Sequence, residues 1–436
     1  SRLGASELED IVASVALIRP GPIKGNMVEP FINRRQGLEP VTYLHPKLES
    51  ILAKTYGVVL FQEQVLEIAQ EIAGFSPGEA DRLRRVMSHA RSRQDMEKIG
   101  QDFVAKSVEN GVEQGVAETI FSYMAGYASY GFCEAHAAAF ATTAFKTGYL
   151  VEHYPAEFFA AVLSQQPMGF YSPNTLCVEL RRRGIGILPP DVNKSGKDFS
   201  VEQGDVRISL ARVKNMTEED LIKLLAARQD REFTSFHDFC RRSGARKDVL
   251  ESLVLCGACD GLHSNRRQLY WSIESELQAR HMEESALLFE SHEPYANIPD
   301  YTPEEKLYNE YEILGINSRQ HFMAFWREKY GITDVLTTRE VTNVPDGQTV
   351  TVGGMVIRPH RPPTKSGKTV VFLSLEDEFG LIDITVFQDV YQQYGNFLFG
   401  GKRPPLAVTG TVQRRGQGLS VTAWKLEDLR KYFNRH

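Results

Sequence analysis

Val370-Val-Phe-Leu-Ser-Leu375 and Ile382-Asp-Ile-Thr-Val386 place apolar residues at or close to every second position. Such alternation is typical of strands that bury one of their two faces. The same alternation recurs in three further segments, which lie around Val350, Leu406 and Leu419. Five short strands separated by glycine-containing turns predict a small closed barrel of the OB type, which we assign to residues 341–436.

Towards the N-terminus the spacing of apolar residues is helical. They recur at intervals of three and four in Val58–Ile72, Val104–Met124 and Ala137–Leu163. After residue 165 prolines interrupt this pattern, Val206–Val213 alternates like a short strand, and short helices follow. The fold class predicted is therefore multidomain α+β, composed of a mainly helical domain over 1–165, a small α+β segment over 166–282 and the C-terminal barrel.

The formal net charge of −6 is unevenly distributed along the chain. It is −5 over residues 1–165, +2 over 166–282, −8 over 283–312 and +5 over 313–436. Because the acidic stretch also contains three prolines, we expect a solvated connector that buries little there. A domain boundary is placed at this stretch, and residues 283–340 are predicted to form the connector and a helix.

The composition limits the class of protein. The chain has 436 residues, of which 42% are apolar and 24% charged, as in ordinary soluble globular proteins. No run approaches the roughly 18 apolar residues of a membrane helix, so no membrane partner is expected. Five scattered cysteines do not form a disulfide framework and no signal pattern is present, which predicts a cytoplasmic location. Because the first residue is not Met, we expect a part of a longer protein.

A run of arginines is the first candidate binding site. The segment Asp81–Lys98 contains Arg82, Arg84, Arg85, Arg91 and Arg93, with no acidic residue between the first and the last of them. On a continuous helix Arg82, Arg85 and Arg93 would share one face. Arginine forks match phosphate oxygens, so a triphosphate or a nucleic-acid backbone is the predicted partner. The alternative is an ordinary solvated helix face.

Two further motifs allow a functional and a structural interpretation. Leu17-Ile-Arg-Pro-Gly-Pro22 leaves Arg19 as the only charge in a rigid apolar turn. Gly126–Phe140 is a turn rich in glycine and aromatic residues that leads into a helix carrying His136 among alanines. The first motif can bind a ligand through Arg19 or be a structural turn. The second can bind a ligand through His136 or hold that histidine as a packed side chain.

Metal binding is not predicted within this chain. His237-x₂-Cys240 and Cys256-x₂-Cys259 have the pair spacing of a zinc ribbon. Both pairs, however, fall in predicted helices instead of glycine-rich knuckles, so packing of a helical hairpin is the favoured interpretation. No P-loop, no Gly-x-Ser-x-Gly and no paired metal-binding carboxylates of a nucleotidyl transferase occur in the sequence.

Five motifs in the first domain together resemble a known family. They are Ala16–Ile23, Leu44–Leu48, Thr55–Val58 with Phe61–Val65, Gly78–Arg85 and Gly131–Ala138. This order is similar to the fingers region of bacterial C-family DNA polymerases, the DnaE-type catalytic subunit of polymerase III. The resemblance continues through a helix-hairpin-helix region into the OB domain. Gln165–Pro173, Leu188–Asn193 and Asn265–Gln268 most resemble the error-prone, damage-associated branch, often called ImuC.

The resemblance implies a DNA-directed DNA polymerase acting in replication or in error-prone translesion synthesis. In the family, palm carboxylates hold the Mg²⁺ ions that activate the primer 3′-oxygen. Those carboxylates precede the Arg-Pro-Gly-Pro motif, and this chain begins just ahead of it. We therefore expect Mg²⁺ to be bound by residues outside this chain, and the chain alone to bind without catalysing. The rival hypothesis is a non-catalytic module that binds single-stranded DNA or partner proteins.

The resemblance also implies roles for individual residues. Arg82, Arg84 and Arg85 would hold the incoming dNTP, Arg19 would support the same pocket, and His136 would lie over the sugar of the nucleotide. The expected nucleic-acid partner is primer-template DNA. Its predicted contacts are Arg91 and Arg93, the barrel cations Arg358, Arg361, Lys365, Lys368, Arg414 and Arg415, and the stacking residues Phe372 and Phe387. The alternative for the two phenylalanines is a place in the barrel core.

Three departures from the family pattern alter these expectations. Cys133-Glu-Ala135 replaces the usual Asn-Lys-Ser and removes a positive charge beside the nucleotide site. Lys214-Asn-Met-Thr217 lacks the glycine of the first helix-hairpin-helix hairpin, which favours packing over phosphate contact. Ser285-Ala-Leu-Leu-Phe289 keeps the apolar end of a sliding-clamp peptide without its glutamine. Leu288 and Phe289 are therefore predicted to bind the clamp weakly, aided by accessory mutagenesis proteins.

Overall fold

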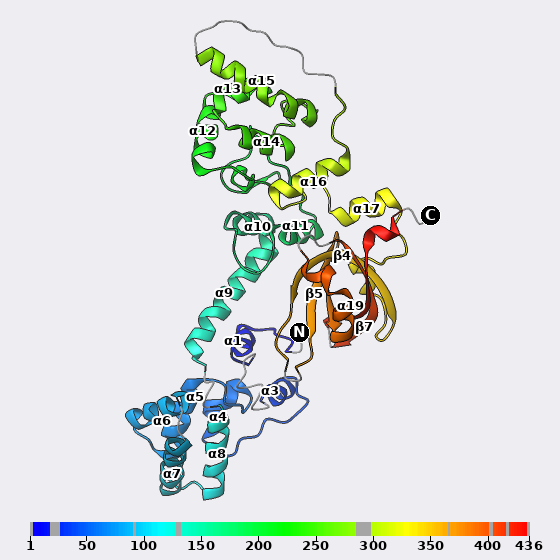
Figure 1. Cartoon of the computed structure of the whole chain (residues 1–436). Helices are drawn as coiled ribbons and strands as arrows, with labels where there is room; N and C mark the ends of the chain where they lie inside the picture. Colours follow the sequence, from blue (N-terminus) through cyan, green and yellow to red (C-terminus); the bar gives the residue numbers. More distant parts are fainter. Residues whose placement is uncertain are drawn as a thin grey trace. The chain divides into compact units, whose positions relative to one another are not determined.

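The structure, a computed structural model, describes residues 3–17, 27–89, 93–127, 132–284, 298–364, 367–400, 404–415 and 418–433 (Figure 1). The chain divides into two compact units, Ser1–Leu150 and Val151–His436. No helix among the described residues is long and apolar enough to cross a membrane. The fold is α+β and multidomain, as predicted from the sequence, with helices throughout and one closed barrel.

The first unit is helical in the residues that the structure describes. Its α-helices are α1 (Leu8–Leu17), α3 (Val28–Arg35), α4 (Leu48–Leu52), α5 (Gln62–Ala73), α6 (Pro77–His89), α7 (Arg93–Glu109), α8 (Gln114–Tyr127) and most of α9 (Glu134–His153). One apolar core lies among α4 to α8, and a second joins α1, α3 and residues 58–61. Gln64 is buried at the start of α5, where its side-chain oxygen accepts hydrogen bonds from the backbone N–H groups of Leu60 and Phe61.

The second unit begins with short helices and a small sheet. Its elements before the barrel are α10 (Pro155–Ser164), α11 (Pro173–Arg182), β1 (Ile187–Leu188), β2 (Ser200–Glu202), β3 (Asp205–Arg207), α12 (Glu218–Gln229), α13 (Phe236–Ser243), α14 (Lys247–Leu255), α15 (Arg266–Glu284), α16 (Pro303–Leu314), α17 (Phe322–Tyr330) and α18 (Thr338–Val341). The strand predicted over Val206–Val213 is shorter than expected, because the chain turns into a 3₁₀ helix at Leu210–Arg212.

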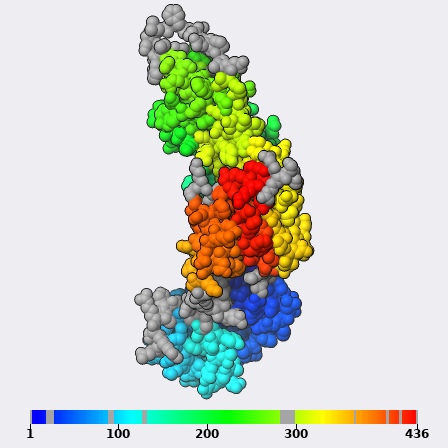
Figure 2. All heavy atoms as spheres, turned by 45° about the vertical axis from the view of Figure 1, so that its right-hand side comes forward, coloured from blue at the N-terminus to red at the C-terminus, as the bar shows by residue number. Residues whose placement is uncertain are grey.

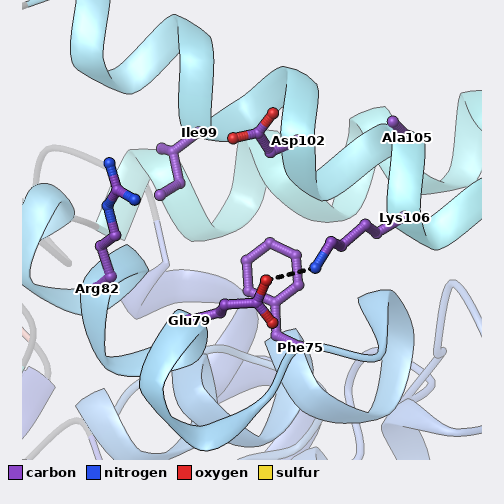
Figure 3. Close-up of a pocket in the computed structure, with 7 residues that line it drawn as sticks. All are labelled: Phe75, Glu79, Arg82, Ile99, Asp102, Ala105 and Lys106. Carbon is purple, nitrogen blue, oxygen red and sulfur yellow. Dashed lines mark hydrogen bonds and ion pairs between the residues drawn. The ribbon is translucent and has the colours of Figure 1, made fainter.

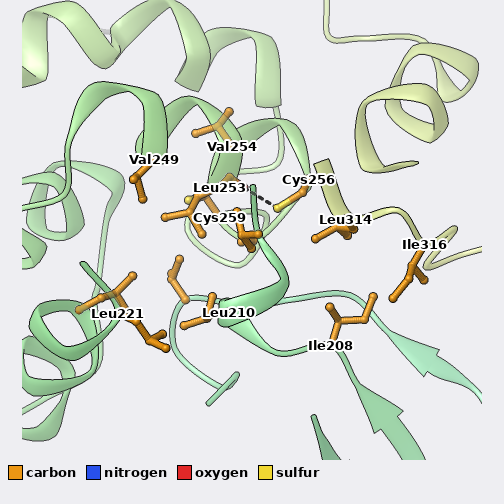
Figure 4. Close-up of a cluster of buried hydrophobic side chains, with 14 of the residues drawn as sticks. Ile208, Leu210, Leu221, Val249, Leu253, Val254, Cys256, Cys259, Leu314 and Ile316 are labelled. Carbon is orange, nitrogen blue, oxygen red and sulfur yellow. Dashed lines mark hydrogen bonds between the residues drawn. The ribbon is translucent and has the colours of Figure 1, made fainter. Parts of the chain in front are cut away.

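The acidic connector differs from its prediction where the structure describes it. Residues 303–314 form helix α16, which starts with Thr302 as its N-cap and buries Leu307, Glu310 and Leu314. Figure 4 shows Leu314 and Ile316 at the edge of the apolar core formed by α12 to α15. The expectation that this stretch buries little was wrong for α16, because Glu310 finds a buried cationic partner in Arg266.

The cysteines belong to the same core. Cys240, Cys256 and Cys259 are each at most 1% exposed, and burial raises the pKa of all three thiols. His237 contacts Glu276 instead, with Nδ1 2.7 Å from Oε2. The packing interpretation is confirmed. Within the described part of the chain, no group of three or more His, Cys, Asp or Glu side chains could hold a metal ion.

The barrel consists of five strands and one helix. The elements are β4 (Thr349–His360), β5 (Val370–Asp377), β6 (Gly380–Phe387), α19 (Gln388–Phe399), β7 (Leu406–Arg415) and β8 (Gly418–Asp428). They close in the order β4-β5-β6-β8-β7, and β6 pairs with β8 in parallel. Valine, leucine and isoleucine from every strand fill the interior. This is the five-stranded Greek-key barrel of OB folds predicted from the alternation.

Candidate nucleic-acid interface

The outward face of β5 and β6 carries the two predicted stacking residues. Burial along β6 alternates strictly, with Ile382, Ile384 and Val386 inside. Phe372 on β5 and Phe387 on β6 point outward and are 39% and 51% exposed. They do not belong to the barrel core. In OB folds the face of the second and third strands is where oligonucleotides bind, and β5 and β6 are those strands here.

Trp424 extends this face onto β8. It was not among the contacts predicted from the sequence. It is 51% exposed, and because Val386 pairs with Ala423, its position adjoins that of Phe387. The register between β7 and β8 shifts at this point and leaves Trp424 as an extra, unpaired residue. The signal was present, because alternation with Val421 and Ala423 inside places Trp424 outside. An apolar residue at an outward position requires an explanation.

The predicted cations of the barrel are divided between the loop that joins β4 to β5 and the strands β4 and β7. Arg361 and Lys368 belong to the loop between β4 and β5 and are exposed, and Arg361 donates a hydrogen bond to the hydroxyl of Tyr391, at 3.2 Å. Arg414 is held at the surface, because its guanidinium donates to the carbonyl oxygens of Thr342 and Val344. Lys365 and the side chain of Arg415 lie outside the described residues. In Figure 2 the orange and red surface of the later part of the barrel borders a yellow surface that belongs to residues preceding it in the chain.

The arginine run of the first unit has an acidic partner that the sequence analysis overlooked. Asp81, one residue before Arg82, pairs with both Arg84 and Arg85, at 2.8 and 2.7 Å. Hydrogen bonding from Arg84 and the charge of Arg85 hold the pKa of Asp81 below its ordinary value. Arg85 remains 71% exposed at its side chain, whereas Arg84 is 29% exposed. The two guanidinium groups therefore lie close together, and the carboxylate of Asp81 neutralises part of their charge.

Arg82, three residues before Arg85 on helix α6, has other neighbours. It lines a shallow hollow between α6 and α7 together with Glu79, Asp102 and Lys106 (Figure 3). The arginine face expected from Arg82 to Arg93 lies partly outside the described residues, which omit positions 90–92. The side chain of Arg93 is not described, and Arg19 and Arg91 lie outside the described residues.

His136 lies on the surface of the first turn of α9. Its ring is between those of Phe132 and Phe140, with centroid distances of 5.3 and 4.7 Å, and the residue is exposed. Glu134, at the position where the family usually has lysine, pairs with Lys54 at 2.6 Å. The imidazole is therefore exposed and also packed between two aromatic rings.

Residues of both helix-hairpin-helix hairpins form hydrogen bonds or ion pairs with neighbouring helices. Asn215 takes the left-handed φ of +67° that glycine usually supplies, and its side-chain amide donates to Ser252 at 3.1 Å. In the α13–α14 hairpin Gly244 is left-handed, while Arg246 pairs with Asp220 and Lys247 with Glu274. These contacts favour packing at both hairpins. Leu288 and Phe289 of the predicted clamp peptide lie outside the described residues.

The whole arrangement defines a class of protein: a helical domain followed by two modules of types that bind nucleic acid. Comparison with family models agrees. Residues 1–111 match the bacterial DNA polymerase III alpha subunit finger domain, 184–269 match a helix-hairpin-helix motif, and 350–429 match an OB-fold nucleic acid binding domain.

Comparison with curated relatives indicates a more specific class of protein. The chain is 52% identical to an error-prone DNA polymerase of Symbiobacterium thermophilum, covering 98% of this chain and 44% of that protein. It is 36% identical to an error-prone DNA polymerase of Pseudomonas paraeruginosa, with 98% and 42% coverage, and 35% identical to error-prone DNA polymerase 1 of Agrobacterium fabrum, with 98% and 41%. The chain thus spans less than half the length of these relatives. Its sequence matches a segment of DnaE-type bacterial DNA polymerases of the ImuC-like, error-prone branch.

Proposed function

We propose that this chain supplies the dNTP-binding and template-binding parts of an error-prone, DNA-directed DNA polymerase. The observation that carries the proposal is the outward aromatic face of the barrel, formed by Phe372, Phe387 and Trp424. Bases of any sequence stack on such rings, and cations on the adjoining loops attract the phosphate backbone. The family relationship supports the polymerase assignment. Mg²⁺ would be held by carboxylates of the parent enzyme outside this chain, and primer-template DNA would be the substrate.

Single-strand binding by the barrel is the first test. We expect the full chain to bind fluorescein-labelled oligo-dT, with log affinity falling linearly as log salt concentration rises, because neutralised phosphates release counterions. Replacing Phe387 and Trp424 by alanine should weaken binding by about 1–3 kcal/mol for each base that loses its stacking partner, or roughly five- to 150-fold per base. Fluorescence anisotropy titrations at several salt concentrations measure both effects.

The matched control is Trp271→Ala. Trp271 is 73% exposed on α15, a helix that is not part of the barrel. Its replacement should therefore leave the affinity for oligo-dT unchanged. Equal affinities of the wild-type chain and the Phe387→Ala/Trp424→Ala variant would refute the assignment of this face.

The dNTP site is a second part of the proposal. We place the triphosphate at Arg84 and Arg85, where guanidinium groups shared by one carboxylate can turn towards phosphate oxygens. Arg85→Ala should lower the affinity for a fluorescent dNTP analogue about ten-fold, the effect of losing one hydrogen bond to a charged group. Arg82→Ala provides the comparison, because Arg82 lies in the hollow with Glu79 and Asp102. An equal loss in both variants would argue for a diffuse cationic surface.

His136 and the clamp peptide complete the proposal. The exposed ring of His136 would lie over the nucleotide sugar, and Arg19 would support the pocket. A sliding clamp and accessory proteins would recruit the polymerase through Leu288 and Phe289. The family relationship supports these assignments, as does, for His136, its exposed position between Phe132 and Phe140.

A further inference from the structure

The loop between α10 and α11 displays large apolar side chains at its tip. Met168, Phe170 and Tyr171 are 45%, 80% and 60% exposed. Phe170 is the most exposed large apolar side chain among the residues that the structure describes. The loop packs none of these side chains into the core of the second unit. Adjacent exposed aromatic residues of this kind usually mark a binding surface.

Arg358 of the barrel contacts both rings of this loop. Its guanidinium carbon lies 5.6 Å from the ring centroid of Phe170 and 5.3 Å from that of Tyr171. Arginine stacks on aromatic faces at such distances through cation–π attraction. The contact brings a loop near residue 170 against the barrel, although 187 positions separate Tyr171 from Arg358 in the chain.

Arg358 lies in a bulge of strand β4 and has a left-handed backbone conformation. The register between β4 and β5 shifts between Ile357 and His360, which makes a bulge. Arg358 has a φ of +47° within it, a left-handed conformation that costs a residue other than glycine about 1–2 kcal/mol. Bulges redirect side chains and are frequent beside functional sites. Here the bulge directs a cation towards the exposed rings.

The same strand connects the loop to the predicted binding face. Two residues after Arg358, His360 lies beside Phe372, with ring centroids 5.6 Å apart. Phe372 in turn pairs across the strands with Thr385 of β6, the strand that carries Phe387. A row of flat rings and cationic side chains therefore runs from the 170–171 loop through the bulge onto the OB face.

We infer that Phe170, Tyr171 and Arg358 form a stacking platform that extends the single-strand site of the barrel by about two bases, one for each ring. This inference rests on the proposed single-strand binding of the barrel. The chemistry favours nucleic acid over an apolar protein surface, because the guanidinium that lies over the rings can also contact a backbone phosphate. The net charge of +5 over residues 313–436 is of the sign that this partner requires.

Oligonucleotide length provides the test. The full chain is titrated with oligo-dT of about 4 to about 16 nucleotides, the range of site sizes of single OB folds. The wild-type chain and the Phe170→Ala/Tyr171→Ala variant should bind the shortest oligonucleotides equally. On the longest the variant should be at least about five-fold weaker, which is the lower limit for losing one stacked base. Because both side chains are exposed, the melting temperature should not change.

Two further measurements make the test specific. Arg358→Gly removes the cation while glycine accepts the left-handed backbone, so it should reproduce the length-dependent loss. Oligo-dT with a single 5-iodouracil, moved along the strand, should crosslink to the 170–171 loop only near one end. Trp271→Ala is again the control with unchanged affinity at every length.

Each other outcome contradicts the inference in a recognisable way. No effect of Phe170→Ala/Tyr171→Ala at any length, with Phe387→Ala/Trp424→Ala impaired, would assign the loop to a protein partner and leave the barrel proposal intact. An equal loss at all lengths would show an indirect effect on the barrel. No effect of the barrel variant at any length would refute the proposed function itself.

Discussion

Arg266→Ala should destabilise the second unit by about 3–5 kcal/mol, the usual cost of breaking a buried ion pair from one side. Arg266 is 1% exposed and its guanidinium contacts Asp260 at 2.7 Å and Glu310 at 2.9 Å. Glu310 is also 1% exposed, so its carboxylate would stay in the core with Ser318 as its remaining close hydrogen-bond donor. A cavity would also form beside Gly257, whose missing Cβ leaves the space that the guanidinium fills. Urea denaturation followed by circular dichroism measures the loss.

The neighbouring arginine is the control for this variant. Arg267 is 30% exposed at its side chain and contacts Glu305 at 3.3 Å on the surface. Exposed pairs contribute only about 0–1 kcal/mol, so Arg267→Ala should have a free energy of unfolding close to that of the wild-type chain. Similar losses in the two variants would mean that the buried network does not hold α16 against the core.

Glu376→Ala should cost about 2–6 kcal/mol, because two buried donors lose their acceptor at about 1–3 kcal/mol each. Glu376 of β5 is 1% exposed and accepts hydrogen bonds from Asn174 at 2.8 Å and Thr175 at 2.5 Å, both on α11. His321 lies on its other side, with Nε2 3.5 Å from the carboxylate. This one side chain therefore joins the barrel to the helices before it. The loss should appear as earlier unfolding and as faster proteolysis between α11 and the barrel.

The contribution of Glu376 should depend on pH. Burial alone would raise its pKa, but His321, Thr175 and Asn174 together hold the pKa below the ordinary value of 4.5. A lowered pKa in the folded state means that the stabilisation is present above pH 4.5 and is lost as the pH falls through the folded-state pKa. The difference in free energy of unfolding between the wild-type chain and Glu376→Gln should therefore shrink in acid. Trp271→Ala, which removes an exposed side chain that does not titrate, should show no such change.

Local patterns were sufficient to predict the barrel and most helices. Alternation along Ile382, Ile384 and Val386 predicted a strand with one buried face, because a strand reverses its side chains at every residue, and these three side chains are buried. The outward positions of Phe372 and Phe387 follow from the same rule. Trp424 could have been found in this way as well. The motifs of the first domain identified the polymerase family, since their order along the chain needs no knowledge of contacts.

Helix ends and charge partners were less accessible to local patterns. Asp81 is an exception, because it precedes Arg84 and Arg85 by three and four residues, a spacing that allows ion pairs on any helix. The strand predicted over Val206–Val213 ends early, because the chain turns into a 3₁₀ helix at Leu210–Arg212. The acidic composition of residues 283–312 predicted solvation, whereas the structure buries Glu310 against Arg266.

The sequence by itself determined the class of fold, the inward and outward faces of the strands and the family, because these depend on periodicity and on order along the chain. Only the tertiary structure showed which surfaces are formed by segments that are distant from each other in the sequence. Arg358 contacts Tyr171, and Glu376 contacts Thr175, across 187 and 201 positions respectively. No local pattern encodes such pairs, because they form only when closure of the barrel and docking of α11 bring distant segments together.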